Sequence, residues 1–173
     1  MNKKFMLIGS PGSGKSYLAR SLSQKLNIPA YHMDNLYWRP DKTHITRAEL
    51  VTIIADIMER DEWIIDGNYI STMEQRIQGT NVIIYLDLPT EQCIDGIRSR
   101  MGKKRDDMPW IEESLDEEFL EFVHNFEDEI KPQVEELLKR YPDKKVIRLT
   151  SAEEKERFKA IDNYDELLAW NVN

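Results

Sequence analysis

The chain has 173 residues, of which 40% are hydrophobic, and its 24 Lys and Arg against 32 Asp and Glu give a formal net charge of −8. This length and composition indicate one globular domain with a core of its own. The acidic balance argues against direct, sequence-independent binding to nucleic acid, the single Cys93 excludes an internal disulfide, and no apolar run approaches the ~18 residues of a membrane span. We therefore expect a cytoplasmic protein with neither nucleic acid nor a membrane among its direct partners.

Short apolar runs alternate with longer amphipathic patterns along the chain, which is typical of βαβ units and predicts an α/β fold. We expect strands at residues 4–8, 29–33, 63–66, 81–87 and 145–150. Several of these runs are rich in Ile, Val and Tyr, and most end in a polar residue or a glycine. Together they predict one mostly parallel sheet of five strands.

Helical patterns fill the intervals between these strands. The first carries Ala19 and Leu22 on one face, at a spacing close to the 3.6 residues of a helical turn. The second begins at a capping box formed by Thr46 and Glu49, in which each residue satisfies a free amide of the other. A third helix is expected after Pro89. Its buried side is formed by Cys93, Ile94, Ile97 and Met101.

The chain from Trp110 onward is acidic and has a helical pattern. Its apolar face is formed by Leu115, Phe119, Phe122, Val123, Phe126 and Ile130. Pro132 lacks the N–H donor of a helix interior, so a break is expected there, followed by a new helix over 132–139. After the last strand, two short helices are expected over 152–159 and 163–170.

A glycine-rich segment separates the first strand from the first helix. Residues 9–16 read GSPGSGKS and match G-x-x-x-x-G-K-[ST], the phosphate-binding loop. Backbone N–H groups and the helix N-terminus can face one polyphosphate, while Lys15 supplies a cation for the β and γ oxygens and Ser16 a hydroxyl for Mg²⁺. ATP and Mg²⁺ are therefore the predicted cofactors. The predicted nucleotide-binding residues are Gly9, Ser10, Pro11, Gly12, Ser13, Gly14, Lys15, Ser16 and Tyr17.

An acidic residue, Asp34, follows the second predicted strand, at the sheet edge where ligands collect. Its carboxylate either accepts a proton from an acceptor hydroxyl or helps to hold Mg²⁺, and the structural alternative is a solvent-facing helix N-cap. Tyr37 and Trp38 either stack on a base or sugar or pack in the core. The three histidines show no metal-ligand spacing and are expected to be ordinary polar or packing residues.

Two further strands end in a carboxylate, Asp66 and Asp87. A carboxylate on a strand next to the phosphate-binding loop is the usual means of orienting Mg²⁺ through its water shell. We favour Asp66 together with Ser16 for the metal, because Gly67 leaves space beside the carboxylate. Asp87 is then expected only to cap the helix that follows it.

A basic segment lies after the third helix, and its cations are Arg98, Arg100, Lys103, Lys104 and Arg105. Arginines on a short mobile segment can close over phosphates and stabilise the charge on a transferring group. We therefore take Arg98, Arg100 and Arg105 as catalytic candidates. They join Lys15 and Asp34, which complete the predicted catalytic set. The alternative is a solvated, salt-bridged surface.

These motifs give the chain a family resemblance over residues 3–150. The loop GSPGSGKS, followed by HMDNLYW, WIIDGNY, VIIYLDLP and FLEFVHNF, resembles the small P-loop kinases of the adenylate kinase type. More closely, the combination of HMDNLYW with WIIDGNY is similar to the bacterial topology modulation protein family. The loop alone is shared by a vast superfamily, whereas that combination is much more specific.

The resemblance implies a three-layer α/β/α P-loop fold like that of nucleoside monophosphate kinases, with its five parallel strands in the order 2-3-1-4-5. It implies a single domain over 1–173, with an acceptor-binding region at about 34–68 and a short lid at about 98–108. Lys15 and Ser16 fall on the catalytic lysine and the magnesium hydroxyl, and Asp66 falls on the aspartate that orients hydrated Mg²⁺. Arg100 falls on an arginine at the base of the lid.

The chain departs from this pattern at two places. Gly96 stands where such kinases commonly carry another phosphate-contacting arginine, so either Arg98 replaces that residue or activity is weaker. Asn68 and Tyr69 stand where adenylate kinases continue with Phe-Pro-Arg beside the acceptor nucleotide, so AMP is not implied as the acceptor.

The sequence thus leads to two hypotheses about function. The first is a kinase, monomeric or homodimeric, that moves the γ-phosphoryl group of Mg·ATP to a nucleotide, a nucleoside or another small hydroxylated acceptor. The second is a nucleotide-binding regulator or slow ATPase that affects DNA topology through a partner.

Overall fold

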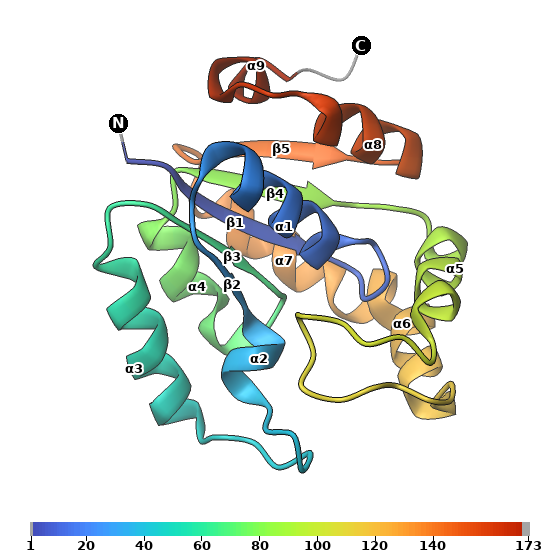
Figure 1. Ribbon diagram of the computed structural model, residues 1–173. Helices are drawn as coiled ribbons and strands as arrows, with labels where there is room; N and C mark the ends of the chain where they lie inside the picture. The colour runs from blue at the N-terminus through green and yellow to red at the C-terminus, as the bar shows by residue number, and fades with distance from the viewer. Residues whose placement is uncertain (1, 171–173) are drawn as a thin grey trace.

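Five strands form one parallel sheet in the computed structural model, which describes residues 2–170 (Figure 1). They are β1 (Lys4–Gly9), β2 (Ala30–His32), β3 (Trp63–Asp66), β4 (Val82–Leu86) and β5 (Lys145–Leu149). Their order is β2-β3-β1-β4-β5, and every pairing is parallel. The predicted α/β fold and strand order are therefore confirmed. Met1 and 171–173, the ends of the predicted domain, lie outside the described residues.

Helices cover both faces of this sheet. The described residues form α1 (Lys15–Leu26), α2 (Met33–Tyr37), α3 (Arg47–Met58), α4 (Ile70–Gly79), α5 (Thr90–Arg100), α6 (Glu117–Glu129), α7 (Lys131–Lys139), α8 (Ala152–Ala160) and α9 (Tyr164–Leu168). Buried residues of α1, α5, α8 and α9 pack on one face, and those of α4 and α7 pack on the other. Helices α2 and α3 pack together beside the edge formed by β2 and β3. The result is the three-layer α/β/α arrangement.

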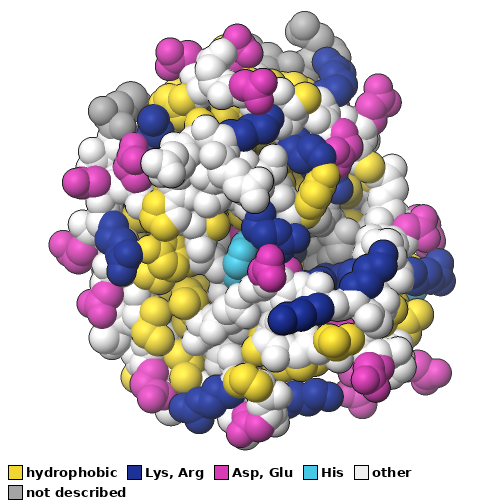
Figure 2. Space-filling view, in the orientation of Figure 1, with side chains coloured by type: hydrophobic (Ala, Val, Ile, Leu, Met, Phe, Trp, Pro, Cys, Tyr) yellow, Lys and Arg dark blue, Asp and Glu magenta, His cyan; other side chains and the backbone are white. Residues whose placement is uncertain are grey.

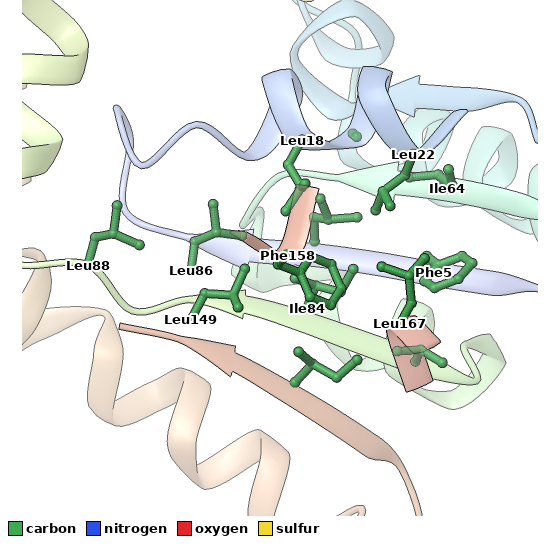
Figure 3. Close-up of a cluster of buried hydrophobic side chains, with 14 of the residues drawn as sticks. Phe5, Leu18, Leu22, Ile64, Ile84, Leu86, Leu88, Leu149, Phe158 and Leu167 are labelled. Carbon is green, nitrogen blue, oxygen red and sulfur yellow. The ribbon is translucent and has the colours of Figure 1, made fainter. Parts of the chain in front are cut away.

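The larger core lies between the sheet and α1, α5, α8 and α9 (Figure 3). Phe5 of β1, Ile84 of β4 and Phe158 of α8 meet there and have no exposed surface. Because the central strands are covered on both faces, their sequences are almost continuously apolar rather than alternating. This explains why the sequence pattern marks β1 and β4 clearly.

Local signals set the ends of several helices as expected. Thr46 and Glu49 form the predicted capping box at the start of α3. Helix α5 begins directly after Pro89. Pro132 separates α6 from α7, since it occupies the first turn of α7, where the lack of an N–H donor costs nothing. Among the described residues, the structure shows no helix that is both long and apolar enough to cross a membrane.

The start and the apolar face of the predicted helix after Trp110 need correction, and two helices were not predicted. The helical pattern read from Trp110 becomes a helix only at Glu117, because the side chain of Asp116 caps that end by accepting from two backbone N–H groups. Two residues assigned to its apolar face, Leu115 and Phe122, are exposed, at 38% and 39%. Helices α2 and α4 were not predicted: α2 has only five residues, and the buried residues of α4 include the polar Thr72 and Arg76.

Candidate active site

The phosphate-binding loop (residues 9–16) connects β1 to α1 at the carboxyl edge of the sheet. Two glycines allow α5 to pack directly against it. Gly12 has φ +81°, and a Cβ there would lie 2.0 Å from the carbonyl oxygen of Cys93. A Cβ on Gly96 would lie 2.0 Å from the carbonyl oxygen of Gly12. Any side chain at the position of Gly96 would therefore displace the loop.

A cavity of about 1260 Å³ opens beside this loop. Its walls come from the loop, from α2, from residues 66–69 after β3, from α5 and from the connection between α5 and α6. Figure 1 shows that connection, residues 101–116, reaching across to α2. We call residues 101–116 the lid segment. Figure 2 shows a hollow on this face with several Lys and Arg side chains gathered around it.

Lys15, Ser16 and Asp66 meet on the loop side of the cavity. The hydroxyl of Ser16 donates to Oδ1 of Asp66 at 3.1 Å, and Nζ of Lys15 donates to the carbonyl of Ser10 at 3.0 Å. Burial lowers the pKa of Lys15, although the charges of Asp66 and Asp34 oppose that shift. Asp66 also pairs with Nδ1 of His32, a contact that the sequence did not indicate.

Ser16 and Asp66 are the residues that would hold Mg²⁺. The described residues contain no group of three or more His, Cys, Asp or Glu side chains placed to bind a metal ion. Mg²⁺ usually keeps several waters and takes its remaining oxygens from one or two side chains and from substrate phosphates. The hydroxyl of Ser16, at the start of α1, and the carboxylate of Asp66, at the end of β3, lie 3.1 Å apart and fit this requirement.

Asp87, the alternative metal carboxylate, lies outside this cavity. It accepts from Nη1 of Arg148 at 2.6 Å and forms an ion pair with Nζ of Lys131 at 2.9 Å. The N-cap of α5 is Pro89, and no side chain caps that end. The expectation that Asp87 caps the helix is therefore wrong, because two cations from β5 and α7 bind its carboxylate instead.

Asp34 of α2 also lines the cavity, near enough for its charge to act on Lys15. Its Oδ1 accepts from the hydroxyl of Tyr69 at 2.7 Å. Burial raises the pKa of the carboxyl, even though the hydrogen bond from Tyr69 and the charge of Lys15 lower it. Asp34 lies inside α2, whose N-cap is His32, so the N-cap alternative is wrong.

An aromatic wall continues from Asp34. Trp38 and Trp110 line the cavity and meet edge to face, with ring centroids 5.7 Å apart. Tyr37 packs instead against His44 and Tyr69, at 4.7 Å and 5.3 Å between centroids, and does not line the cavity. The two possible roles of the pair are thus divided between them: Tyr37 packs, and Trp38 faces the cavity.

The three candidate arginines differ in position. Arg100 and Arg105 line the cavity, and both form ion pairs with Glu112 of the lid segment, at 3.3 and 3.4 Å. Arg105 also lies 3.5 Å from Asp107. The side chain of Arg98 is 60% exposed, pairs with Asp95 on the outside of α5 and does not line the cavity. The structure therefore does not bring Arg98 to the site.

Other side chains reach the site without a sequence signal of their own. The side-chain amide of Asn68 both accepts from the N–H of Gly9, at 3.0 Å, and donates to its carbonyl, at 2.7 Å. Lys155 of α8 donates to the carbonyl of Ser13 at 3.3 Å and lines the cavity. Asn68 could have been found from its place two residues after Asp66, whereas nothing near Lys155 in the sequence marks it.

The chain matches a known protein family over most of its length. The family model described as "ATPase family associated with various cellular activities (AAA)" matches residues 5–161, which include the phosphate-binding loop and all the cavity residues described above. The chain belongs to this AAA family. None of the curated proteins compared with the chain matches it. Membership of the AAA family supports nucleotide binding at the loop.

Two solved structures share the fold of this AAA-family chain. A gluconokinase from Sinorhizobium meliloti 1021 is 14% identical, with a TM-score of 0.55, and the match covers 97% of this chain and 90% of that one. A shikimate kinase from Acinetobacter baumannii, in complex with shikimate, is also 14% identical at a TM-score of 0.55, with 90% and 88% covered. Both are small-molecule kinases by name, and at this identity the likeness shows the fold alone.

Proposed function

We propose that the protein is an ATP-dependent kinase that transfers the γ-phosphoryl group of Mg·ATP to a small acceptor, namely a nucleotide, a nucleoside or another hydroxylated compound. One observation carries the proposal: a single cavity is lined both by the phosphate-binding loop and by the largely buried carboxylate of Asp34. At about 1260 Å³ it has room for two substrates. A nucleotide hydrolase without an acceptor would not need a cavity of this size.

Each residue of the site has a task in this reaction. An acceptor oxygen attacks the γ phosphorus, the bond from that phosphorus to the bridging oxygen breaks, and ADP leaves. Asp34 takes the proton of the acceptor hydroxyl. Lys15 and Arg100 stabilise charge on the transferring group. Mg²⁺, held by Ser16 and oriented by Asp66, would neutralise charge on the β and γ oxygens.

The proposed acceptor-binding region and lid both contribute residues to the cavity. One domain carries an acceptor-binding region at about 34–68 and a lid at about 98–108, which includes Arg100 and Arg105 of the cavity wall. Trp38 and Trp110 offer flat apolar surfaces on which a nucleobase or a sugar face can rest. We further propose a monomeric or homodimeric cytoplasmic protein. The motifs HMDNLYW and WIIDGNY support the finer assignment to the topology modulation protein family.

One observation favours the second candidate, a nucleotide-binding regulator or slow ATPase that affects DNA topology through a partner. Arg100 and Arg105, the arginines best placed to reach phosphates, both have an acidic partner in Glu112. Phosphates would have to compete with this carboxylate. If phosphates compete only weakly with Glu112 for these two arginines, turnover would be slow even with an acceptor present.

The test is ADP release from Mg·ATP by the purified protein, measured against a panel of nucleoside monophosphates, nucleosides and sugars. If the protein is a kinase, one class of acceptor should stimulate ADP release. Lys15→Ala should lower this stimulated ADP release by about 100-fold or more. The melting temperature of the variant should stay the same, because the loop lies above the core. Lys104→Ala, at an exposed lysine, is the matched control.

Two results would contradict the proposal. Unchanged turnover in Lys15→Ala would exclude the mechanism. Tight ATP binding with slow release that no acceptor stimulates would favour the regulator.

A further inference from the structure

Residues 67–69, which we call the turn, link the phosphate-binding loop to Asp34 through hydrogen bonds. The turn follows Asp66 at the end of β3 and leads into α4. On the ATP side, the amide of Asn68 makes paired hydrogen bonds with both backbone groups of Gly9, as a neighbouring strand would. On the acceptor side, the hydroxyl of Tyr69 donates to Asp34. One short stretch of backbone thus sets the positions of the phosphate-binding loop and of the proposed base.

The backbone of this turn is not one that the chain adopts unaided. Gly67 has φ +126°, and a Cβ there would lie 2.7 Å from the side chain of Met33. Tyr69 has φ +36°, in the left-handed region that non-glycine residues rarely occupy. Such conformations persist only where surrounding contacts determine them strongly. Some group must therefore hold the turn in place.

That group is Arg76 of α4, whose side chain is fully buried. Its Nη1 donates to the carbonyl of Gly67 at 2.7 Å, and its Nη2 donates to the carbonyls of Asn68 and Tyr69. The planar guanidinium fork therefore bonds three successive carbonyl oxygens, all those of the turn. A lysine ammonium has no fork of this geometry, because it presents a single nitrogen.

The burial of Arg76 has a cost that packing does not explain. Among the described residues it has no ion pair with a carboxylate, and its Nε has no hydrogen-bond partner. Burial lowers the pKa of the guanidinium to about 9, with the charge of Asp66 opposing that shift. An apolar side chain of similar size would fill the space without this penalty. The site therefore uses the hydrogen-bond donors of the Arg76 guanidinium and not merely the volume of its side chain.

We propose that Arg76 is a positioning residue that couples ATP binding to acceptor activation, because it holds the turn through which Asn68 sets the phosphate-binding loop and Tyr69 sets Asp34. The coupling to the acceptor rests on the kinase function proposed above. The coupling to nucleotide binding does not.

The experiment compares Arg76→Lys with Arg47→Lys. Arg47 also donates to a backbone carbonyl of α4, that of Ser71 at 3.1 Å, but it is exposed and bonds none of the three carbonyls of the turn. We measure melting temperature, the Kd of a non-hydrolysable Mg·ATP analogue by calorimetry, and acceptor-stimulated turnover. For Arg76→Lys we expect about tenfold weaker binding and a kcat about 100-fold lower, since supporting residues of this kind commonly cost 10–100-fold. Arg47→Lys should match the wild type.

A double-variant cycle with Asn68→Ala separates positioning from general stability. If Arg76 acts through the turn, Arg76→Lys with Asn68→Ala binds the analogue no more weakly than the weaker single variant. Additive losses, or normal binding and kcat in a folded Arg76→Lys, would overturn the proposal.

Asn68→Ala keeps the test decisive if Arg76→Lys does not fold, because normal analogue binding in that variant would also overturn it. The binding arm needs no phosphoryl transfer. A wild-type protein without acceptor-stimulated turnover would therefore end the kinase proposal and leave the positioning proposal to be judged on binding alone.

Discussion

Asp34 brings a carboxylate into a largely buried part of the cavity, where water solvates it poorly. Burial raises the pKa of this group above its ordinary value of 3.8, although Tyr69 and Lys15 favour the charged form. A base with a raised pKa accepts a proton more readily, which suits the proposed role. The same shift means that the folded protein is less stable with Asp34 ionised than with it protonated.

The variant Asp34→Asn should therefore be more stable at neutral pH and much less active. The folded-state pKa lies above the unfolded value, so the wild type loses stability relative to this variant as pH rises through the folded pKa, and the difference disappears below the unfolded value. Tyr69 can still donate to the amide oxygen. We expect melting to be a few degrees higher at pH 7 and kcat about 100-fold lower.

Thermal melting between pH 3 and pH 8, with turnover at pH 7, measures both effects. Asn35→Ala, at an exposed neighbour on the same helix, controls for changes in α2 itself. A variant that melts below the wild type at pH 7 would contradict the assigned burial cost.

At the scale of an element, the lid segment brings both cations and anions to one cavity. It has no helix or strand of its own, and its acidic side chains bind the arginines beside it. Nε of Arg100 and Oε2 of Glu112 lie 3.3 Å apart, yet these two atoms have no well-formed hydrogen bond. Burial and the nearby charge of Arg105 lower the pKa of Arg100, while Glu112 opposes that shift. A phosphate could bind these arginines in place of Glu112.

Removing this competing carboxylate should strengthen nucleotide binding. We expect Glu112→Gln to bind the Mg·ATP analogue several-fold more tightly, because two arginines lose an anionic partner and become available to phosphate. The gain should shrink as salt screens the charges. Calorimetric titration at low and high salt measures it.

Glu113→Gln is the matched control, since it makes the same change of charge at the next residue, which lines the cavity but is exposed. Equal gains in the two variants would show that net charge, and not release of Arg100 and Arg105, is responsible.

At the scale of the whole molecule, the last helices complete the core that holds the site. Helix α8 follows β5, packs against α1 and carries Lys155 to the phosphate-binding loop. Phe158 of the same helix is fully buried among residues of β1, β4 and α1 (Figure 3). The stability of the fold and the position of a cavity cation therefore depend on one helix.

The variant Phe158→Ala should lower the free energy of unfolding by about 3–5 kcal/mol, the usual cost of emptying a fully buried phenylalanine site. Urea denaturation followed by circular dichroism measures this loss. Phe122→Ala, at a phenylalanine that is 39% exposed on α6, should cost about 1 kcal/mol or less. Similar losses for the two variants would contradict the core assignment.

Much of the fold could be predicted because its signals are local. An apolar run bounded by polar residues predicted each strand, Thr46 and Glu49 predicted the start of α3, and Pro132 predicted the break between α6 and α7. Helix α4 was missed, since its buried residues include the polar Thr72 and Arg76 beside Met73 and Ile77. Local sequence does not distinguish a buried arginine from an exposed one.

The sequence by itself determined the positions of the strands and of most helices along the chain, the phosphate-binding loop with Lys15 and Ser16, and the carboxylates of Asp34, just after β2, and of Asp66, at the end of β3. These features depend on spacing along the chain, which residue type and period reveal. The sequence favoured Asp66 over Asp87, and the structure places Asp66 beside Ser16. Only the tertiary structure decided that Arg148 and Lys131 bind Asp87, that Arg98 points away, and that Arg76 bonds the turn. The pairings of Ser16 with Asp66 and of Asp87 with Arg148 join residues far apart in the chain, and the direction in which Arg98 and Arg76 point depends on what packs around their helices. The fold, and not the local pattern, therefore determines these contacts.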